Sequence, residues 1–121
     1  MTRKKILLVD DCPTTLLMEE MVLRGERYQL VSARNGLEAI ERVDAERPDL
    51  ILLDIVMPGM NGLEACREIR KRPYSQNVPI IMVTSRRESD KAALPDSGHD
   101  YILKPINGAE LLGKVRGYLG S

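Results

Sequence analysis

The sequence predicts an α/β fold in which a five-stranded, mostly parallel sheet is covered by helices on both faces. Apolar, strand-like runs alternate with segments of helical periodicity from one end of the chain to the other. Most of these runs are continuously hydrophobic, as expected of strands whose two faces are both buried. Strands that alternate with helices run parallel, joined by helical crossovers. The 121 residues suit one domain, which we expect to span 1–121.

The expected strands and helices follow one another in a regular order. The strands are predicted at 6–9, 28–33, 50–53, 78–83 and 101–103. A first helix is predicted at 14–24, with Gly25 as its C-terminal cap. Three more helices are expected to begin after Asn35, Asn61 and Asn107, each followed by Gly and, three residues later, by Glu. Asn caps free backbone N–H groups, and the Glu reaches back to the capping residue. Asn-Gly is also typical of hairpin turns, but the helical periodicity that follows favours helices.

Composition and charge exclude several classes of partner. Eighteen Lys and Arg balance eighteen Asp and Glu, so net charge indicates neither nucleic acid nor a membrane as the main partner. No apolar run approaches the ~18 residues of a membrane span, and the apolar stretch at 6–9 is too short for a secretory signal. The two cysteines have no framework or metal-type spacing. We expect a soluble, cytoplasmic protein.

Polar side chains interrupt the apolar pattern where four of the five predicted strands end. The second strand, in contrast, is followed by Arg34 and no acid, which suits a peripheral strand in the order 2-1-3-4-5. Ligands of open parallel sheets bind at the carboxyl ends of the strands. One shallow cleft is therefore expected to collect Asp10 and Asp11 from the first strand, Asp54 from the third, Thr84 from the fourth and Lys104 from the fifth.

The residue types in this cleft favour phosphoryl transfer. Three neighbouring carboxylates repel one another unless a cation joins them, and Mg²⁺ prefers such oxygen ligands. Asp10 and Asp11 are the expected holders of the ion, and Asp54 can be both ligand and nucleophile. Lys104 and Thr84 would contact phosphoryl oxygens. Positioning and electrostatics suffice for this reaction, with no general base.

The Asp10–Asp11 pair, the segment 52–62, Thr84 with Ser85, and the segment 101–105 together resemble the receiver domains of response regulators of the chemotaxis (CheY-like) type. The resemblance runs over nearly the whole chain. It implies a flavodoxin-like, doubly wound sheet in the order 2-1-3-4-5. It also implies Mg²⁺, a histidine kinase or phosphotransfer protein as phosphodonor, and a downstream protein target or output domain.

The resemblance also assigns a role to individual residues. It implies phosphorylation at Asp54, metal binding by Asp10, Asp11, Asp54 and the backbone carbonyl of Val56, phosphoryl contacts from Thr84 and Lys104, a Thr84–Tyr101 switch pair, and a cis peptide bond between Lys104 and Pro105.

The segment between Thr84 and Lys104 departs from the family pattern. It is about two residues shorter than is typical of receivers. Pro95 lies where a fourth helix is expected, so this helix is predicted to be short or distorted, at about 89–94. Arg86 is an alternative contact for the phosphoryl oxygens, and His99, the one histidine, is expected to be a loop residue.

The first helix is more apolar than one buried stripe requires. A stripe through Met18 and Val22 is expected to face the sheet. Leu17 and Met21 would then be exposed, for which kinase docking or self-association is the alternative to simple core packing.

Three other functions remain as alternatives. Phosphohydrolases of the haloacid-dehalogenase type use a second Asp two residues after the nucleophile, where this chain has Val56. A nucleotide or flavin module would need a glycine-rich loop after the first strand, and 12–15 contain no glycine. A degenerate receiver would act only as an interaction surface.

Overall fold

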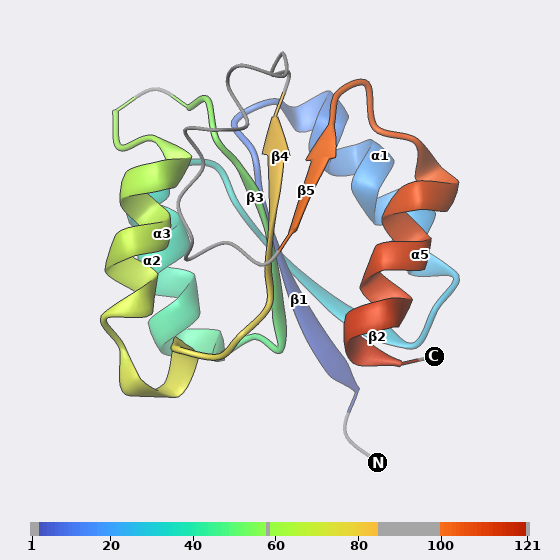
Figure 1. The fold of residues 1–121 in the computed structure, drawn as a ribbon. Helices are drawn as coiled ribbons and strands as arrows, with labels where there is room; N and C mark the ends of the chain where they lie inside the picture. Colours follow the sequence, from blue (N-terminus) through green and yellow to red (C-terminus); the bar gives the residue numbers. More distant parts are fainter. Residues whose placement is uncertain (1–2, 58, 85–99, 121) are drawn as a thin grey trace.

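A computed structural model of the chain describes residues 3–57, 59–84 and 100–120 and shows one parallel sheet (Figure 1). Its strand order is β2-β1-β3-β4-β5, as predicted, so the fold class is confirmed. The strands are β1 (Lys4–Val9), β2 (Tyr28–Ala33), β3 (Leu50–Asp54), β4 (Ile80–Thr84) and β5 (Asp100–Leu103). The strand β4 begins two residues later than the sequence indicates.

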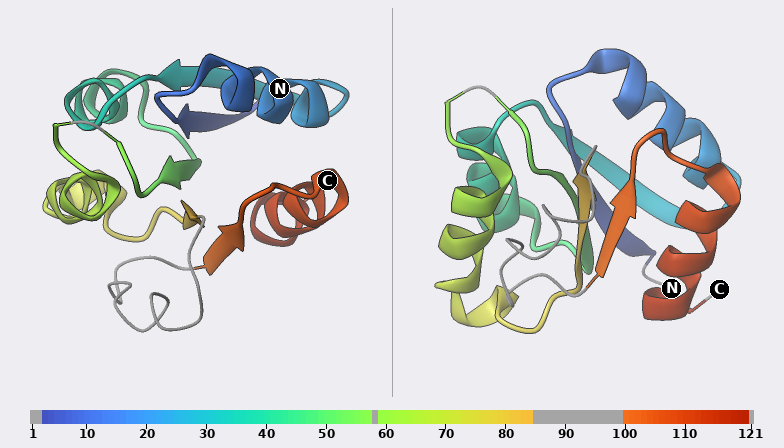
Figure 2. Two further views of the ribbon diagram at one scale, coloured as in Figure 1. Left: turned by 90° about the horizontal axis from the view of Figure 1, so that it is seen from above. Right: turned by 45° about the horizontal axis from the view of Figure 1, so that its top comes forward.

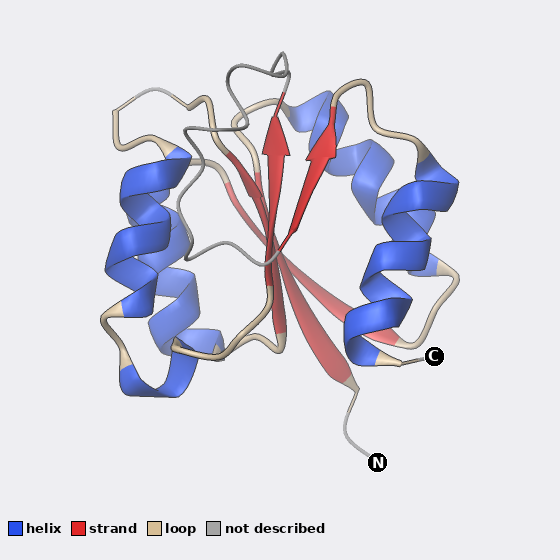
Figure 3. Cartoon of the chain, in the orientation of Figure 1, coloured by secondary structure: helices blue, strands red, loops and turns tan. Residues whose placement is uncertain are grey.

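The α-helices of the described residues lie in two layers around this sheet (Figures 2 and 3). They are α1 (Pro13–Arg24), α2 (Gly36–Glu46), α3 (Gly62–Arg70) and α5 (Gly108–Leu119), and a short 3-10 helix, η1 (Pro73–Ser75), follows α3. The helices α2 and α3 cover one face, and α1 and α5 cover the other. Among the described residues, no helix has both the length and the hydrophobicity to cross a bilayer. The predicted fourth helix, with Arg86 and His99, lies outside the described residues.

The sheet is buried on both faces because its strand residues point alternately to opposite sides. Leu7 and Val9 of β1 pack toward α2 and α3. Ile6 and Leu8 pack toward α1 and α5. Burying one such side chain contributes about 1.5–3 kcal/mol, so the central strands anchor the loops that follow them.

The predicted Asn caps are present, with three differences: the reciprocal Glu contact is not formed at Asn35 or at Asn107, and Gly25 ends α1 without a positive φ. Asn35, Asn61 and Asn107 each accept a hydrogen bond from the backbone N–H three residues later. A complete capping box forms at Asn61, whereas the Glu38 carboxylate accepts from the Arg34 N–H rather than from Asn35. Gly25 ends α1 with ordinary right-handed dihedral angles, so the helix end does not use glycine's access to positive φ.

The predicted buried stripe of α1 is wrong. Leu16, Glu19 and Leu23 are its buried residues, whereas Met18 and Val22 are half-buried. The helix is therefore rotated so that a glutamate faces the protein interior. Leu17 and Met21 are 52% and 63% exposed, as expected. Their role in docking stays a prediction.

Candidate functional site

The register of the parallel strands brings the polar strand ends to one level. Val9 pairs with Leu53, Asp54 with Val83, and Thr84 with Leu103. Asp10 continues β1 and donates its backbone N–H to the Ala33 carbonyl, which extends the ladder by one step. The polar residues at the C-terminal ends of β3 and β4 and directly after β1 and β5 therefore meet at the carboxyl edge of the sheet, as the sequence predicts.

Three carboxylates meet at this edge. Asp10, Asp11 and Asp54 each offer an oxygen atom, and these three atoms lie within 4.8 Å of one another. Asp10 and Asp54 are buried, with 1% and 2% of their surfaces exposed, whereas Asp11 is more accessible. Oxygen atoms this close, on acids mostly removed from water, create a strongly negative cleft.

Lys104 supplies positive charge to this cleft. Its Nζ lies 3.4 Å from Asp10 Oδ2 and 3.5 Å from Asp54 Oδ2, so one ammonium group bridges two carboxylates. Its backbone N–H donates to the Thr84 carbonyl, which ties the residue to the end of β4. Burial lowers the pKa of Lys104, but the two carboxylates outweigh burial and raise the pKa overall. The peptide bond from Lys104 to Pro105 is cis.

The Asp54 carboxyl is a weaker acid in this cleft than a free aspartate. Burial and the negative charge of Asp10 raise its pKa to about 6, against the opposing effects of Lys104 and the backbone N–H of Val56. Near neutral pH the carboxyl is ionised but poorly compensated. A cation in the cleft would relieve this repulsion.

Two buried polar atoms of the cleft have no hydrogen-bond partner among the described residues. They are Asp10 Oδ2 and Thr84 Oγ1. The other oxygen of Asp10, Oδ1, accepts from the Cys12 N–H at 2.9 Å. Buried polar groups are rarely left without a hydrogen-bond partner, so these two atoms are suited to bind a ligand. Asp10 Oδ2 is the type of atom that Mg²⁺ binds, and the Thr84 hydroxyl can donate to a phosphoryl oxygen.

A fourth carboxyl, that of Glu19, was not among the predicted site residues but interacts electrostatically with Asp10, Asp54 and Lys104. Glu19 of α1 is 1% exposed, and its Oε1 has no hydrogen-bond partner among the described residues. Burial first, and then the charge of Asp10, raise its pKa to about 8, against the opposing effect of Lys104. The available signal was spacing, because Leu16, Glu19 and Leu23 lie on one helical face.

Two other predicted residues flank the cleft. Tyr101 of β5 is half-buried and packs against the core under α2 and α3. The Val56 side chain is 60% exposed in the loop after β3, and its N–H reaches the Asp54 carboxylate. The metal contact of the Val56 carbonyl and the Thr84–Tyr101 switch stay predictions.

Gly62 fixes the loop that follows Asp54. Its N–H donates to the Ile55 carbonyl at 2.8 Å, which closes the loop onto the end of β3. A Cβ atom at Gly62 would lie 2.3 Å from the Asp54 carbonyl oxygen and 2.6 Å from Ile55 Cα. Both neighbours are backbone atoms, so the strand itself would have to move.

We therefore expect Gly62→Ala to lower the free energy of unfolding by roughly 2–3 kcal/mol in urea denaturation, because overpacking here displaces backbone. Gly113→Ala is the matched control, since a Cβ there meets no atom of the described segments within 4 Å. It should be neutral or stabilise α5 by up to about 1 kcal/mol. Equal effects of the two substitutions would contradict the close approach of α3 to β3.

Comparisons with known proteins agree with this geometry. Residues 6–116 match the sequence model of the response regulator receiver domain. The DNA-binding response regulator MtrA of Mycolicibacterium smegmatis is 40% identical over 119 residues, which cover 97% of this chain and 51% of MtrA. The chain thus spans about half the length of this curated relative.

Solved structures of similar shape include two receivers. The chemotaxis response regulator CheY4 of Vibrio cholerae has a TM-score of 0.90 and 28% identity, covering 98% of this chain and all of that one. The receiver domain of the sensor histidine kinase PA1611 from Pseudomonas aeruginosa has a TM-score of 0.87 and 31% identity, covering 99% of this chain and all of that one. The PA1611 structure holds a magnesium ion in its active-site cleft.

Proposed function

Because this chain belongs to the response regulator receiver domain family, we propose that it is a phosphoacceptor whose Asp54 is phosphorylated in a Mg²⁺-dependent reaction. The observation that carries the proposal is the convergence of Asp10, Asp11, Asp54 and Lys104 at one edge of the sheet. The proposed phosphodonor is a histidine kinase or a phosphotransfer protein. The proposed consequence is a changed surface for a downstream protein or output domain.

The reaction needs a nucleophile that is ionised and accessible to an in-line donor. One oxygen of the Asp54 carboxylate forms a bond to phosphorus, while the bond from phosphorus to the donor's imidazole nitrogen breaks. The electron pair of that bond stays on the imidazole, which takes a proton from water. Asp54 is ionised at neutral pH, because its pKa is about 6. No base is needed to remove a proton from it.

Asp10, Asp11 and Asp54 would hold the metal, with the predicted help of the Val56 carbonyl. A bound Mg²⁺ would supply charge neutralisation for the carboxylates and for the oxygens of the transferred group. Asp10 Oδ2 fits this role because it is buried and accepts no hydrogen bond from a described residue, with the Lys104 ammonium 3.4 Å away as its ion-pair partner.

Lys104 and Thr84 would bind the product. The Lys104 ammonium, already between two carboxylates, can turn to a phosphoryl oxygen with little movement. The Thr84 hydroxyl, at the end of β4, has no hydrogen-bond partner within the described part of the chain. Movement of Thr84 toward the phosphoryl group would change the space beside Tyr101 on β5. We propose that phosphorylation of Asp54 alters the partner-binding surface in this way.

The same geometry disfavours hydrolysis of outside substrates. The position two residues after Asp54 holds an exposed, apolar Val56, so no second carboxylate follows the nucleophile as acid or base. We therefore infer a stoichiometric acceptor and not an enzyme. With a net charge of zero, direct nucleic-acid binding by this domain is not part of the proposal. A kinase donor implies a cytoplasmic location.

The direct test is incubation with acetyl phosphate and Mg²⁺, followed by intact-mass analysis. We expect one added phosphoryl group on the wild type and none in the presence of EDTA. Asp11→Ala should lose the heat of Mg²⁺ binding in calorimetric titration, because it removes one of three oxygen ligands. A folded wild-type protein that stays unmodified would favour a degenerate receiver that acts only as an interaction surface.

A further inference from the structure

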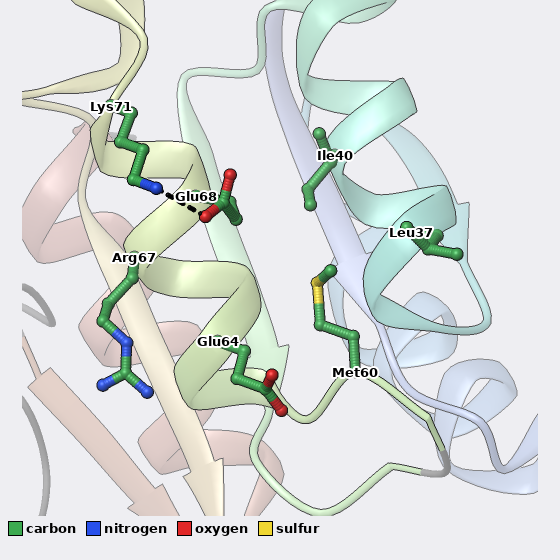
Figure 4. A pocket seen from close by; sticks show the side chains of 7 residues that line it. All are labelled: Leu37, Ile40, Met60, Glu64, Arg67, Glu68 and Lys71. Atoms are coloured by element: carbon green, nitrogen blue, oxygen red, sulfur yellow. Dashed lines mark hydrogen bonds and ion pairs between the residues drawn. The ribbon is translucent and has the colours of Figure 1, made fainter.

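A groove of about 450 Å³ lies between α2 and α3, on the face of the sheet opposite α1 and α5 (Figure 4). Leu37 and Ile40 of α2, with Met60 from the loop before α3, form its apolar wall. Leu37 is 65% exposed, a large apolar side chain left in water. Three charged residues of α3 and Lys71, the residue that caps the C-terminal end of this helix, form the facing wall.

These charges follow a helical pattern. Glu64, Arg67, Glu68 and Lys71 are spaced so that all four lie on one side of α3. Their signs along the helix are negative, positive, negative, positive. Within the chain, Lys71 pairs with Glu68 at 2.8 Å; the Lys71 side chain is 68% exposed and that of Glu68 is 38% exposed. An ammonium has three donors, so Lys71 can contact a second carboxylate as well.

We propose that this groove is an interface between two copies of this chain, related by a two-fold axis that crosses α3 between Arg67 and Glu68. In such a pair the two α3 helices run antiparallel, and every contact occurs twice. Arg67 then faces Glu68 of the second copy, and Glu64 faces Lys71. Each of these four charges then meets an opposite charge of the second copy.

The pattern selects a second copy over other partners. Moving the axis by one turn of helix leaves some of these charges unpaired or facing a like charge, so the sequence favours a single register. A partner of uniform charge, acidic or basic, would be attracted by two of the residues and repelled by the other two. The zero net charge of the chain also removes long-range repulsion between copies.

The apolar wall of the groove supplies the hydrophobic contact area that the ion pairs do not provide. Exposed ion pairs contribute little affinity and mainly set orientation. Burial of Leu37, Ile40 and Met60 against the second copy would add the hydrophobic contribution. The expected association is weak, with a Kd on the order of 100 μM, as is typical of small interfaces. It does not depend on the phosphorylation chemistry.

Sedimentation velocity of the unphosphorylated protein over a concentration series tests the interface. The wild type should dimerise, less so at high salt. Arg67→Glu places a like charge opposite Glu68 of the second copy, at both symmetry-related positions, and should raise the Kd by about tenfold or more. The swap Arg67→Glu with Glu68→Arg restores both pairs and should return the Kd to within about threefold of wild type.

Two controls make the result specific. Arg24→Glu makes the same change in the last turn of α1, on the other face of the sheet, and should leave the Kd unchanged. Leu17→Glu tests the exposed α1 residues as a competing interface, and should also have no effect. Circular dichroism confirms that each variant is folded. A wild type monomeric at about 1 mM, a swap without rescue, or a loss of dimer in Leu17→Glu would overturn the proposal.

Discussion

An Asp54→Asn variant is expected to acquire no phosphoryl group under conditions in which acetyl phosphate and Mg²⁺ modify the wild type. Asn has the same shape, but its amide is a poor nucleophile and carries no charge. Intact-mass analysis gives a direct readout. Modification of the variant at the wild-type level would place the acceptor elsewhere and contradict the proposed function.

The same substitution should stabilise the folded protein when no metal is present. The carboxyl of Asp54 has a pKa of about 6 in the fold, against 3.8 in the unfolded chain. Between these values the folded state keeps a proton that the unfolded state has lost, so stability falls as pH rises. Removing the ionisable group at pH 8 should therefore raise the free energy of unfolding. Because the contacts with Lys104 and Val56 are lost at the same time, the net gain should be about 1–2 kcal/mol.

Urea denaturation in EDTA measures this second effect, and added Mg²⁺ should reverse its direction. The ion stabilises the wild type by mass action, and it should stabilise Asp54→Asn less, because one ligand is changed. A destabilised Asn variant in EDTA would show that Lys104 more than compensates the repulsion between Asp54 and Asp10.

Replacing Glu19 by leucine is expected to stabilise the protein strongly at alkaline pH. Glu19 is buried beside the acidic cluster, with a pKa of about 8 against 4.5 when unfolded. Each unit of difference corresponds to about 1.4 kcal/mol, so keeping this group in the fold at pH 8 costs on the order of 4 kcal/mol. Leucine has similar bulk, no charge, and the buried residues Leu16 and Leu23 beside it on the same helical face.

The pH dependence separates this cause from simple packing. The folded wild type keeps the Glu19 proton up to about pH 8, whereas the unfolded chain releases it near 4.5. Wild-type stability should therefore fall relative to Glu19→Leu as pH rises through this window, and the difference should level off above it. We expect the variant to be more stable by roughly 2–4 kcal/mol at pH 8 and by much less at pH 5.

Glu19→Gln is the matched control for this experiment. It removes the charge but keeps a polar group that lacks a partner, so its stability should lie between the other two and show little dependence on pH from this site. Urea denaturation in EDTA from pH 5 to 8 measures all three proteins. A constant difference between wild type and Glu19→Leu across this range would mean that Glu19 does not titrate as a buried acid.

Both substitutions address one property of the cleft. Asp10, Asp54 and Glu19 are carboxyl groups held away from water, with Lys104 as the cation that the structure places between two of them. Such an arrangement is unfavourable for folding by itself. It suits a site that binds a divalent cation and a phosphoryl group, because the ligands are positioned before these arrive.

The sequence by itself predicted the strand order and the residues that meet at the site. Apolar periodicity is a local signal, and parallel strands connected by helices leave few topologies. The polar residues after β1, β3, β4 and β5 then have one edge to share, so Asp10, Asp54 and Lys104 could be assigned together before any distance was known. The Asn caps were predictable for the same reason, since capping involves neighbours three residues apart.

The sequence of α1 is compatible with more than one buried face, and only the tertiary structure decided between them. Hydrophobicity favoured Met18 and Val22, but the packing of α1 against β1 and α5 buries Leu16, Glu19 and Leu23 instead. The close approach of Gly62 to β3 and the groove between α2 and α3 likewise depend on distant segments coming together. Burial sets the cost of a charge, and burial is a property of the assembled layers; no local pattern could assign a pKa to Glu19.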